Sequence, residues 1–91
     1  MNIQAEISLY PLRTAHVGEI IARFTRELRA NGLKPETGAM STMARGECHL
    51  VFAAAERAFN ACGRDADIVL VLKTSNACPW IRHKKKRIKN A

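Results

Sequence analysis

Residues 3–10, IQAEISLY, open the chain with a pattern that sets its fold. Every second position is apolar, and the intervening side chains are polar or amphipathic. The apolar positions are Ile3, Ala5, Ile7 and Leu9. A period of two is typical of a β-strand with one covered face. Pro11 follows, and because proline has no N–H for a sheet ladder we expect the strand to end there.

The next segment changes to helical spacing. Its apolar residues recur three or four positions apart, which predicts an amphipathic helix. They are Val17, Ile20, Ile21, Phe24 and Leu28. Thr14 precedes them as a candidate N-cap. Asn31-Gly32 follows them as a C-terminal stop, because glycine readily takes the left-handed conformation that closes helices.

The second half of the chain repeats strand, helix and strand. Residues 33–45 predict two short strands joined by a hairpin at Gly38 to Ser41. A second helix is expected from about Glu47 to Cys62, ended by Gly63. Its expected buried stripe is Leu50, Val51, Ala54, Ala55, Ala58, Phe59 and Cys62, with Phe52 outside it. Residues 67–74, DIVLVLKT, form a last strand that is apolar on both faces.

The resulting order is β-α-β-β-α-β, which predicts an α+β ferredoxin-like sandwich. Two helices then cover one face of a four-stranded antiparallel sheet with strand order 4-1-3-2, and the other face is open. In the last strand Val69 and Val71 lie on one face and three other apolar residues on the opposite one. An uncovered apolar row predicts a partner, so we expect a homodimer or a higher homo-oligomer, through sheet faces or edges.

The 91 residues suffice for one domain, and the net charge of +7 is concentrated at one end. Residues 82–89, RHKKKRIK, hold six Lys and Arg, which leaves nine basic against eight acidic residues elsewhere. We therefore expect a nearly neutral ligand-binding domain over residues 1–79. Residues 80–91 are expected to form a disordered basic tail, either simply solvated or in contact with a polyanion.

Several functional classes find little support. No apolar run reaches the ~20 residues of a membrane span, and no signal peptide is evident. Three cysteines at irregular spacing favour a reducing cytoplasm over a disulfide framework. Cys48 and His49 are neighbours whose side chains would diverge by about 100° on a helix, and no metal-binding or phosphate-loop motif occurs. We expect neither catalysis nor a metal or other cofactor.

The expected sheet brings polar groups together at two places. Ser8 and Tyr10 should approach Ser41 and Thr42 on the hairpin, next to Met40. At the opposite end, the side chains that leave the last strand should lie near the start of the second helix. These are Ser75 and Asn76, near Glu47. Neutral hydrogen-bonding groups beside methionine suit a planar heteroaromatic ligand better than a phosphate.

Three segments carry a resemblance to a known family. They are SLYPL at residues 8–12, GAMSTMARGE at 38–47 and TSNACP at 74–79. Together they resemble the YkoF-like family of thiamine- and hydroxymethylpyrimidine-binding proteins. The resemblance implies a ferredoxin-like domain that binds thiamine or its pyrimidine half without chemistry, in cytoplasmic vitamin salvage or transport. The best-known members carry two such domains in tandem, so a homodimer of this chain would supply the second.

An aminopyrimidine needs paired donors and acceptors. Ser41 and Thr42 offer both, Asn76 offers both in one plane, and Glu47 or Glu6 could accept from the exocyclic amine. The expected ligand-binding residues are Ser8, Tyr10, Met40, Ser41, Thr42, Glu47, Ser75 and Asn76.

Structural roles are open alternatives for the same residues. The hairpin hydroxyls would bond the local backbone, Asn76 would form an Asx-turn, and Glu47 would favour the helix dipole. Two other functions also stay open. One is a subunit-interaction or regulatory module, and the other is nucleic-acid binding through the basic tail.

Overall fold

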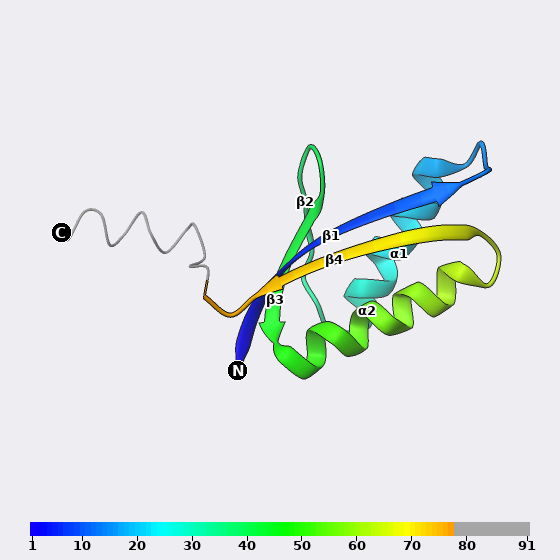
Figure 1. The fold of residues 1–91 in the computed structure, drawn as a ribbon. Coiled ribbons are helices and arrows are strands. Elements are labelled where there is room, and N and C mark those ends of the chain that lie inside the picture. Colours follow the sequence, from blue (N-terminus) through cyan, green and yellow to red (C-terminus); the bar gives the residue numbers. More distant parts are fainter. Residues whose placement is uncertain (78–91) are drawn as a thin grey trace.

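The computed structural model describes residues 1–77, which form one sheet and two helices (Figure 1). The elements are β1 (Asn2–Leu12), α1 (Val17–Ala30), β2 (Glu36–Thr37), β3 (Thr42–Glu47), α2 (Cys48–Gly63) and β4 (Asp67–Ser75). This order confirms the predicted ferredoxin-like α+β fold. Cys78, the boundary at residue 79 and the basic tail lie outside the described residues, so the expectations about them stay predictions.

The four strands form one antiparallel sheet in the order β2-β3-β1-β4. Both helices lie on the same side of it (Figure 1). β1 is central: Ala5 is paired with Ala44 of β3 on one side and with Thr74 of β4 on the other. The predicted strand order is therefore confirmed, and within residues 1–77 one face of the sheet carries no helix.

The core lies between the sheet and the helices. From β1 the alternate residues Ile3, Ala5 and Ile7 are buried, as their spacing predicts. The helices and the connections contribute Phe24, Leu28, Leu33, Val51, Ala54, Ala58 and Cys62. Small side chains on α2 allow close packing of the two helices, because an alanine contact holds the backbones nearer together than a leucine contact would.

Strand β1 is longer than expected. Instead of ending at Pro11 it continues to Leu12, and Pro11 is paired in register with Ile68 of β4. The physical reason is the shape of the sheet. Within residues 1–77, β3 accompanies β1 only as far as Ile7, so the later part of β1 has a single neighbouring strand. Proline is tolerated there because one side of the strand needs no ladder hydrogen bonds.

The start of α1 also differs from the expectation. The helix begins at Val17 with His16 as N-cap, and Thr14 is not its cap. Thr14 Oγ1 instead accepts a hydrogen bond from the His16 N–H at 3.0 Å, which forms a turn before the helix. The predicted stop is confirmed: α1 ends at Ala30, and Gly32 has a φ of +98°.

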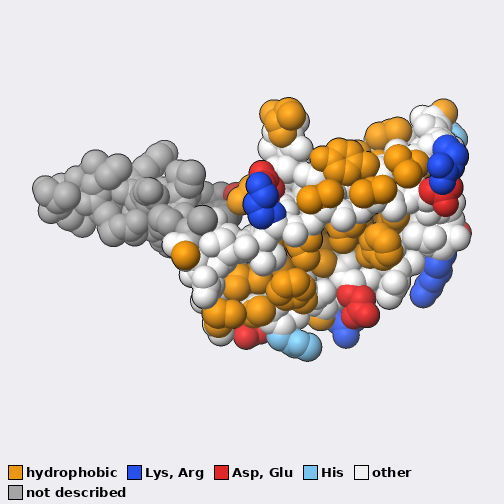
Figure 2. Space-filling view, in the orientation of Figure 1, with side chains coloured by type: hydrophobic (Ala, Val, Ile, Leu, Met, Phe, Trp, Pro, Cys, Tyr) orange, Lys and Arg blue, Asp and Glu red, His pale blue; other side chains and the backbone are white. Residues whose placement is uncertain are grey.

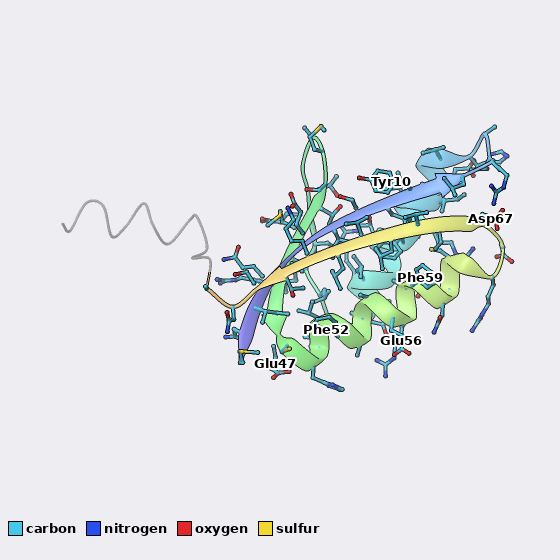
Figure 3. The ribbon with its side chains drawn as sticks, in the orientation of Figure 1. Tyr10, Glu47, Phe52, Glu56, Phe59 and Asp67 are labelled. Carbon is cyan, nitrogen blue, oxygen red and sulfur yellow. The ribbon has the colours of Figure 1, made fainter. Side chains whose placement is uncertain are left out.

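The buried stripe of α2 is narrower than expected. Its buried residues include Val51, Ala54 and Ala58, but Phe59 is 38% exposed. Phe59 lies two helical turns after Phe52, so the two rings share one side of the helix. In Figure 3 both stand on the part of α2 that runs beside β4. Phe52 is exposed as well, so these rings extend the apolar surface of the sheet edge instead of filling the core.

Candidate functional site

The helix-free face of the sheet holds a shallow hollow at one end. Its volume is about 220 Å³. It is lined by Gln4, Ala5, Glu6, Met43, Lys73, Thr74 and Ser75. These residues come from three neighbouring strands, because Glu6 is paired with Met43 on β3 and with Lys73 on β4. Residues directly opposite each other share a face, so their side chains gather at one place. We call this feature the open-face hollow.

Glu6 is the central polar group of the hollow. Its Oε2 accepts a hydrogen bond from Ser41 Oγ at 3.0 Å, and Lys73 Nζ lies 3.4 Å from its Oε1. The Ser41 hydrogen bond, followed by the hydrogen bond and the charge of Lys73, lowers the pKa of Glu6. Glu6 is therefore an ionised acceptor at neutral pH, and its side chain is 42% exposed to any ligand in the hollow.

The hairpin places its two hydroxyl residues on opposite faces of the sheet. Thr42 is paired with Ile7, whose side chain is buried under the helices, so Thr42 lies on the helix-covered face. Ser41 precedes it and turns its hydroxyl to Glu6 on the open face. The expected pair of adjacent hydroxyls is therefore divided, because successive strand residues alternate between faces. Met40 is 90% exposed at the turn.

The other end of the open face is apolar. Tyr10 is paired with Val69, and Ser8 with Val71. Tyr10 is 51% exposed, Val69 44% and Val71 49%. The prediction that one apolar row of β4, of valines or of leucines, faces away from the helices is confirmed, and the exposed row is that of the valines. We call Tyr10, Val69 and Val71 the apolar row, and Figure 2 shows hydrophobic side chains along this part of the surface.

Two of the predicted binding residues, Ser75 and Asn76, lie at the end of β4 in different surroundings. Ser75 is paired with Gln4 and lines the open-face hollow, and its Oγ accepts from the Ala77 N–H at 3.0 Å. Asn76 lies just beyond, where its amide Nδ2 donates to Met1 Sδ at 3.6 Å. Thus Ser75 lines the hollow, whereas Asn76 does not.

Glu47 is engaged at the start of α2. Its Oε1 accepts from the His49 N–H at 2.8 Å, and its Oε2 lies 3.5 Å from the N-terminal ammonium of Met1. The His49 hydrogen bond is the main reason why the pKa of Glu47 is lowered. This geometry corresponds to the helix-capping alternative, because the carboxylate satisfies an N–H that has no partner inside the helix.

Sequence reasoning missed Gln4 and Lys73 as residues of the hollow. A signal for both was present. Gln4 has the same parity along β1 as Glu6 and Ser8, and Lys73 is the only basic residue in DIVLVLKT. The sequence alone did not reveal the strand register, which sets Gln4 opposite Ser75 and Glu6 opposite Lys73.

The described residues also bear on metal binding and membrane insertion. Residues 1–77 contain no group of three or more His, Cys, Asp or Glu side chains placed to hold a metal ion. No helix among these residues is long and apolar enough to cross a bilayer. Cys62 is buried, and its burial raises the pKa of the thiol.

Comparison with known families adds the deciding observation. Residues 5–76 match the family model described as "Thiamine-binding protein". The chain belongs to this thiamine-binding protein family. The match contains β1 from Ala5 on, the hairpin and β4, and so includes most of the three segments on which the resemblance to the YkoF-like family rested. That resemblance is confirmed.

Solved structures show the same fold. A protein of unassigned function from Methanocaldococcus jannaschii is 27% identical, with 99% of this chain and 98% of that one aligned at a TM-score of 0.78. A protein with a candidate role in thiamine biosynthesis or salvage, from Thermotoga maritima, is 20% identical. Its alignment covers 97% of this chain and 99% of that one, with a TM-score of 0.78. A domain of unknown function from Bacillus cereus is 22% identical. Its alignment covers 82% of this chain and 75% of that one, with a TM-score of 0.71. No curated protein shows significant similarity to the chain.

Proposed function

We propose that this member of the thiamine-binding protein family binds thiamine, or its hydroxymethylpyrimidine half, in the open-face hollow and without catalysis. One observation supports this most directly: an ionised glutamate, Glu6, is held by Ser41 in a hollow with a methionine wall. A family whose model is described by thiamine binding makes a site for an aminopyrimidine the natural use of these groups.

The chemistry of the pyrimidine suits this hollow. Its exocyclic amine would donate to Glu6, which Ser41 holds in place, while a ring nitrogen would accept from the amide of Gln4. Met43 offers a soft, polarisable wall for the ring. The carboxylate of Glu6 would also attract the thiazolium cation of thiamine, against the opposing charge of Lys73 beside it. Two or three such hydrogen bonds with one stacked face correspond to roughly micromolar affinity.

A second copy of the chain would complete the pocket. At about 220 Å³ the hollow is smaller and more open than sites that bury most of a small ligand. The apolar row of Tyr10, Val69 and Val71 lies on the same face and gives a partner something to cover. We propose a homodimer in which two open faces meet, with the ligand between them. The role of this protein would be vitamin B1 salvage or transport in the cytoplasm.

Calorimetric titration of the full chain tests the binding proposal. Thiamine and hydroxymethylpyrimidine are titrated separately into the native protein and into Glu6→Gln, with Thr42→Ala as the control on the opposite sheet face. We expect saturable binding to the native protein and to the control, and clear weakening by Glu6→Gln. Absence of heat up to millimolar ligand would refute the proposal, and equal binding by Glu6→Gln would exclude this hollow as the site.

The exposed apolar row also favours a second candidate, a subunit-interaction module without a ligand. It predicts a stable dimer together with no response to either compound. Nucleic-acid binding has less support in the described residues, since Tyr10 is the only aromatic residue on the strands within residues 1–77. The polyanion contact expected through residues 82–89 lies outside the described residues.

A further inference from the structure

A larger cleft lies at the opposite end of the domain from the open-face hollow. It has a volume of about 680 Å³ and is formed by the β1–α1 connection, one side of α1 as far as Arg26, and the turn between α2 and β4. Its apolar lining comes from Leu12, Ile20, Cys62 and Ala66. In Figure 3 the labelled Asp67 marks this end, and Figure 2 shows charged side chains gathered there.

Two ion pairs build the walls of this cleft. Arg13 contacts Asp67 Oδ2 through Nε at 3.2 Å and Nη2 at 3.0 Å, joining the end of β1 to the start of β4. Arg23 Nη1 donates to Asp65 Oδ2 at 3.0 Å, and its Nη2 donates to the Ala61 carbonyl at 2.9 Å. Both guanidinium groups are thus held by carboxylates from the same turn.

The charged side chains that line the cleft carry a net positive charge. Four arginines and three carboxylates line the cleft, which leaves a net charge of +1 with His16 neutral. The third carboxylate, Glu19, contacts His16 Nδ1 at 2.8 Å. Arg26 and Arg64 are the two arginines left over, and neither side chain forms a hydrogen bond or ion pair with any residue of 1–77. Arg26 nevertheless lies close enough to the cleft floor to influence the pKa of the Cys62 thiol.

The backbone at the cleft is strained at one point. Arg13 has a φ of +52°, the only positive φ of a non-glycine residue within the described part of the chain. For an L-residue with a long side chain the left-handed region is costly, and such strain persists where surrounding contacts hold it. In this conformation the Arg13 guanidinium contacts Asp67 at the cleft wall.

We propose that this cleft is a second binding site, for a small organic phosphate. A phosphate monoester carries up to two negative charges, which the guanidinium groups would meet from two sides, Arg26 from α1 and Arg64 from the turn after α2. Guanidinium groups match phosphate oxygens geometrically as well as electrostatically. The apolar floor at Ile20 and Cys62 would receive the organic part of the molecule. We call this feature the arginine cleft.

The arginine cleft is independent of the proposed thiamine site. Along β1, Arg13 lies seven residues beyond Glu6, and at about 3.3 Å per residue this is roughly 20 Å. A single thiamine phosphate could not reach both places. The cleft would therefore hold a separate ligand, and loss of one site should leave the other intact.

Titration with phenyl phosphate tests this proposal on the full chain. The native protein is compared with Arg26→Gln/Arg64→Gln, and with the matched control Arg29→Gln/Arg57→Gln, which removes the same charge from exposed positions on α1 and α2 outside the cleft. We expect saturable binding to the native protein and the control, a loss of at least tenfold in the first variant, and weaker binding of inorganic phosphate. Thiamine titration of the same samples should be unchanged, and the amide resonances of residues 62–66 should shift on binding.

Three results would overturn the proposal. Absence of saturable binding at millimolar phenyl phosphate would remove the site. Equal weakening in both double variants would show a response to total charge alone, and undiminished binding by Arg26→Gln/Arg64→Gln would place the phosphate elsewhere on the chain. Phenylacetate binding as tightly as phenyl phosphate would show that the cleft is not a phosphate site.

Discussion

Ser41 donates its hydroxyl hydrogen to Glu6 at 3.0 Å, across 35 positions of sequence. The contact fastens the turn of the β2–β3 hairpin to the central strand. It also orients the carboxylate that we propose as the acceptor for the ligand's amine. One hydrogen bond thus contributes both to the shape of the hollow and to its charge.

The two hairpin hydroxyls should differ in their effect on binding. Ser41→Ala removes a donor from the open-face hollow, and we expect about fivefold weaker thiamine binding, the equivalent of one ordinary hydrogen bond. Thr42→Ala changes the covered face and should leave affinity unchanged. The double variant should therefore bind like Ser41→Ala, with circular dichroism confirming the fold. Equal weakening by both single variants would contradict the division of the hairpin between the two faces.

The lowered pKa of Glu6 predicts a pH dependence with a definite sign. An unperturbed glutamate titrates near pH ~4.3, and the Ser41 and Lys73 contacts bring the folded pKa below that. The stabilising contribution of Glu6 is then fully present above the unfolded pKa and lost as pH falls through the folded one. Carbon-detected NMR titration should show this pKa rising towards normal in Ser41→Ala. An unchanged pKa in that variant would remove Ser41 as the main cause.

The apolar row should control assembly. Val71→Lys places a charge within the row, and we expect sedimentation to show a shift from dimer to monomer with the fold retained. Val17→Lys is the matched control, because Val17 is 43% exposed at the start of α1, outside the row. If both variants sediment like the native protein, the open faces are not the subunit contact.

The capping carboxylate of α2 should matter for stability and not for the ligand. Glu47→Ala leaves the His49 N–H without its 2.8 Å acceptor, so thermal denaturation should begin at a lower temperature. Glu47→Ser should restore part of the loss, since serine is itself a good N-cap. Thiamine affinity measured below the transition should not change in either variant. A large drop in affinity would return Glu47 to the binding site.

The core between the helices and the sheet should respond most strongly to truncation. Leu28 is completely buried, and Leu28→Ala should lower the free energy of unfolding by about 3 kcal/mol, as measured by urea denaturation. Leu12→Ala is the comparison, since Leu12 is 38% exposed and should cost much less. Similar losses from the two changes would contradict the position of the core.

Local patterns of apolar residues were sufficient to predict which segments form strands and which form helices. The alternation in IQAEISLY and the helical spacing from Val17 to Leu28 each reflect one repeating contact with a single core, so they can be recognised without a structure. The end of a strand and the width of a buried helix face were harder to predict. Pro11 continues β1 because β3 has already ended beside it, and Phe59 stays exposed because the core is narrower than the apolar stripe. Both depend on neighbours that are distant in sequence.

The sequence by itself determined the order of strands and helices, the presence of an uncovered apolar row on β4 and the family, because these follow from periodicity and from residues in recognisable segments. Only the tertiary structure decided which polar groups meet. Register set Glu6 between Met43 and Lys73 and turned Thr42 away from Ser41. A shift of one residue reverses every side chain of a strand, so sheet pairing determined these contacts.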